Sequence, residues 1–429
     1  MAEHVISDSS IKNEKEENVE ENESKTTVKE HMLQYMTVEV LDPEKRNGGA
    51  ALNVRGQDTF IVYQVYSRVT DPSKPGYYDH PTTVWRRYNE FDLLRNYLEV
   101  SYPYIVIPPL PEKRVSHTWQ KLSTDRFESE FIERRRISLE KFLMRCASHA
   151  VLCKDEIFRA FFVEEYGFKD LVDATAYQRK ADSKFSALSA SYGLKSPNPD
   201  IEAIKTYIND LESTLYQILK VRAKIADNFC EHEKLYRSFG QLFDDWGNIE
   251  NETGIALQTA GRHFDIHANV LDKHVSEEEA FAEQLKEYYS FGDCLRGVCK
   301  KAEILQYNVE KTEEMLSNKK LHKENIQQGK NGLMSDMKTK LLGRDSVEQK
   351  EQRLLTISEQ IVDIEGTLQQ QKEELENFLE LAKADIDRFK RQKGKDIKDI
   401  ILNYAIMQRN LSRKQEQIWR KVEETFDKL

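Results

Sequence analysis

The sequence predicts a small α+β domain with a three-stranded antiparallel sheet, followed by an all-α, elongated bundle of three long coiled-coil helices. Three observations support this fold class. Three runs rich in β-branched and aromatic residues precede helical segments between residues 35 and 166. From residue 200 onward, apolar residues recur at steps of three or four. The composition, with 32% charged residues and only 17 Gly and 10 Pro among 429 residues, favours long solvated helices.

Charge and composition exclude several classes of function. The net charge of −10 argues against bulk nucleic-acid binding, so any site for an anion must be a local basic patch. The sequence contains no run of about 18 apolar residues, so we expect no membrane span. The N-terminus also lacks the pattern of a signal peptide. The five cysteines form no C-x-x-C pair, which indicates reduced thiols in a cytoplasmic protein.

The first elements follow from local patterns. Residues 1–34 hold nine acidic and four basic residues, so we expect a disordered acidic tail. Within residues 35–166, "MTVEV", "FIVYQVYSRV" and "TTVWRRY" predict three strands. A helix is expected from about Asn89, with Phe91, Leu94 and Leu98 on one face, and "FESEFIERRRISLEKFLMRC" predicts another after a proline-rich loop.

The remainder predicts a linker and then the bundle. Residues 167–199 end in "SPNPD", whose prolines stop any earlier helix, and the bundle occupies residues 200–429. Its last helix carries an apolar stripe over some 80 residues, or roughly 120 Å. Glycines interrupt the middle segment, and "SEEE" at Ser276 is a rival helix start that would split it in two. No compact monomer buries a stripe of that length, so we expect a dimer.

One ordered set of cations points to a binding site. Arg86 and Arg87 alternate on a strand, so one of them can point into a groove while the other faces solvent. Tyr88 offers a ring to a sugar-like ligand, and Lys113 follows the stiff "PPLPE" loop. Three consecutive arginines fan out from the later helix. Single arginines usually just solvate a surface, and "PPLP" alone also fits a ligand for a partner domain. The order of the set nevertheless indicates a groove for an anionic sugar phosphate.

That order resembles the phox-homology (PX) domain, which binds phosphatidylinositol 3-phosphate on endosomes. The resemblance implies that Arg87 takes the 3-phosphate and that Tyr88 packs on the inositol ring. It also implies that Lys113 takes the 1-phosphate and that Arg135, four residues before Leu139, contacts the remaining hydroxyls.

Two segments are candidates for insertion into a membrane surface. Apolar residues in the basic loop after Lys113 suit the headgroup region, and the alternative is that the tryptophan caps the domain core. A short basic amphipathic helix in the linker is the second candidate, and it could equally pack on the bundle. The residues concerned are Val115, Trp119, Leu122, Phe185, Leu188 and Tyr192.

A basic, glycine-containing stretch at residues 317–345 predicts the turn between the last two helices, which is one tip of an elongated bundle. Charge runs on helices are usually solvated faces, yet cations on an otherwise acidic chain are attracted to anionic lipid by about 1 kcal/mol each. The predicted tip cations are Lys319, Lys320, Lys323, Lys330, Lys338, Lys340 and Arg344.

The whole pattern resembles the sorting nexins that carry a C-terminal BAR domain, a curved helical dimer that senses or imposes membrane curvature. "RRYNEFDLLRNYL", "IVIPPLPEKR" and "ERRRISLEKFLMRCASH" carry this resemblance. It implies a peripheral protein on the cytosolic face of early and recycling endosomes, acting in protein transport, recycling of transmembrane cargo and autophagy. It also implies contact with cargo or adaptor proteins, and pairing with itself or with a related BAR sorting nexin.

No catalytic signature appears, so we expect no enzyme, and neither a cofactor nor a metal. His263 and His267 lie one helical turn apart but lack an evident third strong ligand, although His274 is nearby. The main alternative to a lipid-directed adaptor is a coiled-coil scaffold that binds proteins, with lipid binding incidental. An undetected hydrolase that uses these histidines is a third possibility.

Overall fold

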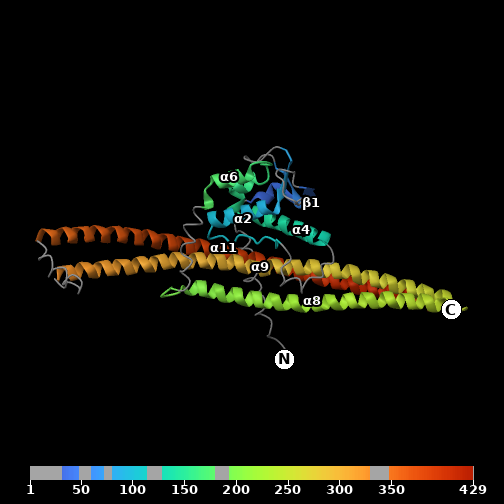
Figure 1. Ribbon diagram of the computed structural model, residues 1–429. Coiled ribbons are helices and arrows are strands. Elements are labelled where there is room, and N and C mark those ends of the chain that lie inside the picture. The colour runs from blue at the N-terminus through green and yellow to red at the C-terminus, as the bar shows by residue number, and fades with distance from the viewer. Residues whose placement is uncertain are drawn as a thin grey trace, which may run out of the picture.

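A computed structural model describes residues 31–47, 59–71, 80–113, 128–178, 193–328 and 347–428. A compact α+β domain lies on the middle of a long helical bundle (Figure 1). Its sheet has the order β1-β2-β3, with β1 at Met36–Asn47, β2 at Thr59–Val69 and β3 at Thr82–Arg87. Both strand pairs are antiparallel. The predicted three-stranded antiparallel sheet is therefore confirmed.

Strand β1 is longer than the "MTVEV" run that predicts it. Its register shifts between Leu41 and Pro43 and then continues to Asn47. Proline has no N–H to donate to a ladder, so the shift keeps the strand paired on both sides of Pro43. The charged sequence after Leu41 hides this extension from a pattern search based on apolar residues.

Helices cover the sheet and close the core of the domain. They are α2 (Tyr88–Ser101), α4 (Glu128–Ala147), α5 (Glu156–Ala160) and α6 (Phe168–Ala174), with short 3₁₀ turns at Met32–Gln34 and Leu152–Lys154. As predicted, Phe91, Leu94 and Leu98 of α2 are fully buried. The packed cluster also includes Phe168 and Tyr177, so it continues into the segment that the sequence assigns to the linker.

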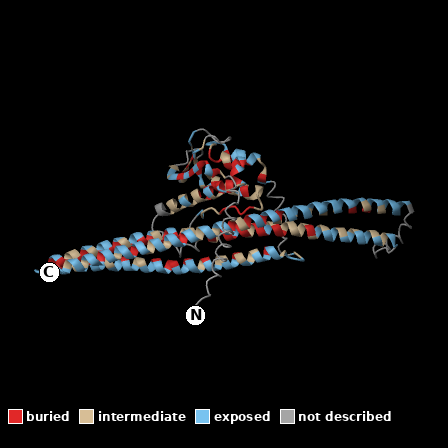
Figure 2. Ribbon diagram, turned by 180° about the vertical axis from the view of Figure 1, so that it is seen from behind, coloured by how far each residue is buried: buried red, intermediate tan, exposed pale blue. Residues whose placement is uncertain are grey.

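The bundle consists of α8 (Pro199–Gly247), α9 (Gly254–Gln327) and α11 (Val347–Phe426). Helix α9 packs against both others, and it runs through Ser276 without a break. The rival start at Ser276 is therefore not used. Beyond the start of α8, α9 and α11 continue as a two-helix arm (Figure 1). Buried residues concentrate in the α+β domain and in the bundle beneath it, while the arm is largely exposed (Figure 2).

Apolar stripes and glycines hold the three helices together. Gly240 of α8 faces Gly261 of α9 so closely that a Cβ on Gly261 would lie 2.6 Å from the Gly240 carbonyl oxygen. Glycine is therefore a packing requirement here rather than a bend. The predicted stripe of α11 supplies these buried residues: Ile357, Ile361, Phe378, Ala382, Ile386, Phe389, Ile400, Leu411 and Ile418.

Candidate functional site

The two arginines that end β3 face opposite sides of the sheet, as the alternation of strand residues predicts. Arg86 is completely buried, and its guanidinium donates to the Phe161 carbonyl at 2.8 and 3.1 Å, to Glu90 and to the Glu164 carbonyl. Burial lowers the pKa of Arg86, while Glu90 raises it. Arg86 therefore serves the core and cannot reach a ligand, and the expectation that the other arginine of the pair faces solvent is wrong, because buried carbonyls and Glu90 bind its guanidinium.

Arg87 points to the exposed side. Its guanidinium carbon lies 3.4 Å from the centroid of the Phe60 ring on β2, and its backbone N–H donates to Glu90 at 2.8 Å. The same residue is the N-cap of α2. Unpaired N–H groups and the positive end of the helix dipole favour an anion at this place. The chain thus presents a guanidinium, resting on an aromatic ring, at the start of a helix.

Tyr88 lies at the centre of the candidate site. Its hydroxyl donates to the Pro111 carbonyl at 2.5 Å, which ties the proline-rich loop to the start of α2. Lys113 Nζ and the Arg135 guanidinium carbon lie 5.7 and 5.3 Å from the centroid of its ring. Burial, followed by the nearby Asp92 carboxylate, raises the pKa of Tyr88 to about 12. The phenol is therefore neutral at physiological pH, and its ring remains available to pack on a sugar.

Lys113 and Arg135 differ in how firmly they are held. Arg135 donates to the Glu112 carbonyl at 3.2 Å and to the Lys113 carbonyl at 2.5 Å, and its guanidinium also covers the Phe131 ring. The Lys113 side chain is 62% exposed and lies 3.9 Å from Asp92. Exposed ion pairs at that distance contribute little, so Lys113 is free to turn toward a phosphate.

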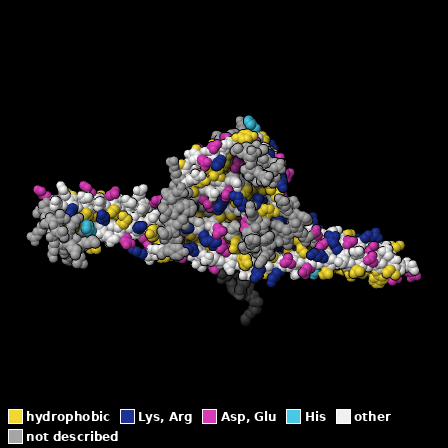
Figure 3. Space-filling model, viewed as in Figure 1, with side chains coloured by type: hydrophobic (Ala, Val, Ile, Leu, Met, Phe, Trp, Pro, Cys, Tyr) yellow, Lys and Arg dark blue, Asp and Glu magenta, His cyan; other side chains and the backbone are white. Residues whose placement is uncertain are grey.

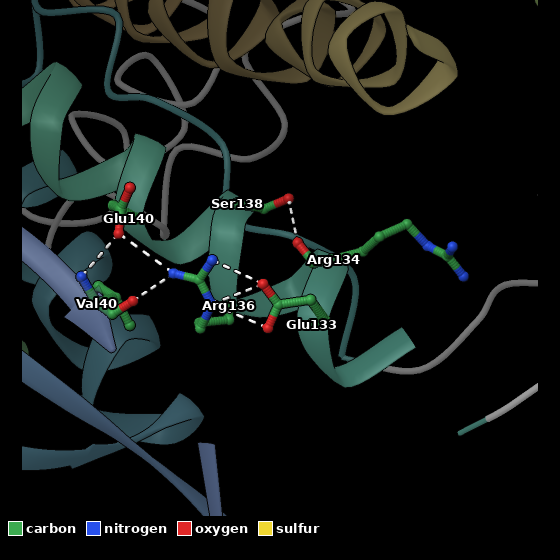
Figure 4. Close-up of polar contacts among 6 residues, drawn as sticks. All are labelled: Val40, Glu133, Arg134, Arg136, Ser138 and Glu140. Carbon is green, nitrogen blue, oxygen red and sulfur yellow. Dashed lines mark hydrogen bonds and ion pairs between the residues drawn. The ribbon is translucent and has the colours of Figure 1, made fainter. Parts of the chain in front are cut away.

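The three consecutive arginines of α4 fan out, as their helical spacing predicts. Arg136 donates to the Val40 carbonyl on β1 and to both oxygens of Glu133, so it fastens α4 to the sheet. Figure 4 shows the Arg134 side chain pointing away from Arg136. The middle arginine, Arg135, is the one placed beside Tyr88. The PX resemblance selects Arg135 because it lies four residues before Leu139, and this arginine lies beside the tyrosine ring.

A cavity of about 110 Å³ lies behind this site, between α4, the proline-rich loop and α9. Arg135 lines it, but Arg87, Tyr88 and Lys113 do not. Glu283 and other acidic residues share the lining with cations. This mixed charge does not favour a phosphate, so the exposed ring of cations around Tyr88 is the better candidate for an anion.

The predicted tip cations fall partly within the described residues. Lys319, Lys320 and Lys323 lie in the last turns of α9, on the two-helix arm. Lys320 pairs with Glu365 of α11 at 2.7 Å, and Lys319 donates to Gln360 at 2.8 Å. These contacts hold the arm together and neutralise part of its charge. The other four tip residues lie outside the described residues: Lys330, Lys338, Lys340 and Arg344. The six candidates for membrane insertion also lie outside them: Val115, Trp119, Leu122, Phe185, Leu188 and Tyr192.

The histidines that resemble a metal site serve packing where the structure describes them. His267 is buried, and its ring centroid lies 4.1 Å from that of the tilted Tyr236 ring, while His274 lies 3.5 Å from Glu278. Burial lowers the pKa of His267, which favours its neutral form. Across the described part of the chain, no group of three or more His, Cys, Asp or Glu residues is placed to hold a metal ion. No described helix is long and apolar enough to cross a bilayer.

Sequence patterns missed two features of the site. The first is Phe60, which lies under Arg87. The sequence predicts that Phe60 belongs to a strand, but it does not predict which residue of a neighbouring strand Phe60 contacts. The second is a contact between the loop that carries Lys113 and the bundle. A signal for it exists in "IVI" before the prolines: Ile105 and Ile107 enter the core of the domain, and Val106 enters that of the bundle.

The chain is similar to a known domain family and to several known proteins. A model of the PX domain matches residues 75–165. Sorting nexin-4 from Bos taurus and from Homo sapiens are each 40% identical to the chain over 399 residues, which cover 92% of this chain and 88% of the relative. Sorting nexin-30 from Mus musculus is 31% identical over 285 residues, or 64% of this chain and 60% of that protein. The family is non-enzymatic, in agreement with the prediction for this chain. Identity at this level over nearly its whole length shows that the chain belongs to the sorting nexin family.

Proposed function

We propose that this sorting nexin is a peripheral membrane adaptor that binds phosphatidylinositol 3-phosphate on endosomes and acts in recycling of cargo and in autophagy. The observation that carries the proposal is the group of cations around Tyr88. Lys113 and Arg135 approach the ring of one half-buried tyrosine from a loop and a helix, and Arg87 precedes this tyrosine at the end of a strand. A phosphorylated inositol needs this combination, because its ring packs on an aromatic face while its phosphates accept from cations.

Each residue of the groove has a separate task in this proposal. Arg87 receives the 3-phosphate, since a guanidinium binds phosphate through two parallel hydrogen bonds and the N-terminus of α2 adds N–H groups. Lys113 receives the 1-phosphate as a mobile point charge, and Arg135 donates to hydroxyls. Specificity then depends on Arg87, whose position beside Tyr88 determines which ring position carries the phosphate.

The bundle supplies the second half of the proposed function, a dimer that senses or induces membrane curvature. Helix α8 buries one stripe against α9, through residues such as Leu215 and Leu219. A second stripe of α8 stays exposed, with members three, four or ten residues apart, which places them on one face. Its members are Ile218, Val221, Ile225, Leu235, Phe239, Leu242 and Trp246. Apolar side chains gather at the end of the bundle where α8 ends (Figure 3).

An apolar stripe of this length favours a protein partner that covers it. We take that partner to be a second copy of this chain or a related BAR sorting nexin, whose own stripe is equivalent. The same stripe also fits the alternative function, a coiled-coil scaffold that mainly binds proteins. The two functions differ in whether the cations around Tyr88 are needed to reach a membrane.

Sedimentation with vesicles distinguishes the lipid-binding adaptor from the protein-binding scaffold. Wild-type protein should pellet with vesicles that contain phosphatidylinositol 3-phosphate and should stay in the supernatant with vesicles that contain only uncharged lipid. Arg87→Ala should stay in the supernatant in both cases. Arg68→Ala is the matched control, because Arg68 is an exposed arginine six residues along β2 from the partner of Arg87, or about 20 Å away. Equal pelleting of all three proteins would favour the scaffold.

A further inference from the structure

The loop that carries Lys113 is shared between the two parts of the molecule. Ile105 and Ile107 are buried in the core of the α+β domain. Val106, between them, is 2% exposed and belongs to the core of the helical bundle. Alternate residues of one extended segment therefore anchor it in two different cores. Val106 lies seven residues before Lys113, the predicted ligand of the 1-phosphate.

A buried carboxylate of the bundle holds this loop. Asp385 of α11 accepts from the Val106 backbone N–H at 2.8 Å and from His149 Nε2 at 2.9 Å. His149 is the donor, since its Nδ1 accepts from the Val151 and Leu152 N–H groups. Two elements of the α+β domain thus meet on one side chain of α11, whose exposed fraction is only 7%.

Asp385 is well suited to hold these donors because it stays ionised. Burial on its own raises the pKa of Asp385, but hydrogen bonds from His149 and Arg388 outweigh burial and lower the pKa to about 2. Arg388, one turn further along α11, donates to it at 2.7 Å. Hydrogen bonds to a charged acceptor are about twice as strong as neutral ones. Loss of this carboxylate would leave the Val106 N–H buried without its partner.

The other end of the loop is fastened by residues of the lipid groove. Tyr88 donates to the Pro111 carbonyl, and Arg135 donates to the Glu112 and Lys113 carbonyls. Between the two ends, the Arg95 side chain donates to the Pro108 carbonyl at 3.0 Å. Prolines at 108, 109 and 111 restrict the backbone in between. A short, stiff segment therefore connects Asp385 with Tyr88, Lys113 and Arg135.

We propose that Asp385, on the helical bundle, is a positioning residue for the phosphoinositide groove of the α+β domain, acting through the Val106–Lys113 loop. The proposal rests on the proposed function and goes beyond it, because it makes a residue of the bundle responsible for the shape of the groove that binds the headgroup. Through this loop, a shift of α11 relative to the domain moves Lys113 and the carbonyls that orient Arg135. Coupling of this kind is reciprocal, so a bound headgroup also stabilises the contact between Val106 and Asp385.

The first test measures binding of a soluble headgroup, so that vesicle curvature and avidity play no part. Calorimetry of the full chain with inositol 1,3-bisphosphate should show Asp385→Ala binding at least about fivefold more weakly than wild type, the lower end of typical coupling between sites. Asp387→Ala, the matched control, removes a carboxylate from the groove between α8 and α11 and should bind like wild type. Equal affinity for wild type and Asp385→Ala would overturn the proposal.

The second test uses wild-type protein, so it holds even where Asp385→Ala fails to fold. Hydrogen exchange at the Val106 amide should slow when inositol 1,3-bisphosphate binds. Arg87→Ala, with the same ligand added, should show no slowing. A merely structural role for Asp385 predicts an exchange rate at Val106 that does not respond to the ligand, and that result would contradict the coupling. Failure of wild type itself to bind the headgroup would instead refute the proposed function.

Discussion

Arg86 and Arg87 are chemically identical neighbours, and the structure predicts that their loss has opposite consequences. Arg86→Ala removes a guanidinium that is 0% exposed and that donates to the Phe161 and Glu164 carbonyls and to Glu90. It also removes cation–π contacts with the Phe161 and Phe168 rings at 4.8 and 4.9 Å. Arg87→Ala removes an exposed guanidinium that rests on one ring.

The magnitude for Arg86 follows from what its loss leaves behind. Two carbonyls lose their buried partner, and Glu90 loses its counter-ion. Each buried carbonyl left without a partner costs about 1–3 kcal/mol, so the two together cost about 2–6 kcal/mol. Domains are stable by only about 5–15 kcal/mol, so Arg86→Ala should leave the α+β domain close to unfolding. For Arg87→Ala the expected cost is about 1 kcal/mol or less, because an exposed cation–π contact contributes no more than that.

Urea denaturation together with vesicle sedimentation distinguishes the two variants. Arg86→Ala should lower the midpoint of unfolding of the α+β domain by about 1–3 M, given typical slopes for small domains. Arg86→Lys should recover little of this, since an ammonium cannot match the fork of bonds to two carbonyls. Arg87→Ala should unfold like wild type and fail to bind vesicles. An Arg86→Ala protein with wild-type stability would refute this assignment of roles.

Three further predictions concern the bundle and its contact with the α+β domain. Lys338→Glu combined with Lys340→Glu should abolish vesicle tubulation while sedimentation with phosphatidylinositol 3-phosphate persists, and wild-type tubulation would remove the tip from the proposed mechanism. Ile225→Glu places a charge in the middle of the exposed α8 stripe and should shift the protein from dimer to monomer in analytical ultracentrifugation, whereas an unchanged dimer would mean that the partner binds another face. Because the pKa of Asp385 falls from 3.8 to about 2 on folding, its contribution of about 2 kcal/mol should be complete above about pH 4 and lost as the pH falls through about 2. Urea unfolding at pH 5 and pH 2.5 tests this, and Asp385→Asn should lose less stability than wild type between these two values.

Local periodicity explains how much of the fold could be predicted from the sequence. Strand alternation separates Arg86 from Arg87, and helical spacing places Phe91, Leu94 and Leu98 in one core. The stripe of α11 was visible for the same reason, because a helix repeats its environment at short, regular steps. Of the proposed lipid ligands, Lys113 and Arg135 lie beside the ring of Tyr88, and the roles of all four residues as ligands stay predictions.

Contacts between distant segments could not be predicted from the sequence, because a local pattern does not show which surfaces pack against each other. Asp385 reads as one of many acidic residues on a solvated helix, yet it is buried under Val106, 279 residues earlier in the chain. Phe60 and Arg87 likewise meet only because β2 and β3 pair in one particular register. Lys319 and Lys320 read as free cations for a membrane, whereas both contact α11.

The most direct test of the central claim compares two vesicle compositions of equal charge. One contains phosphatidylinositol 3-phosphate and the other the same fraction of phosphatidylinositol 4-phosphate. If Arg87 beside Tyr88 reads the position of the phosphate, wild-type protein pellets with the first composition and stays in the supernatant with the second. Equal pelleting with both would mean that the cations around Tyr88 respond only to surface charge, which would contradict a groove built for one headgroup.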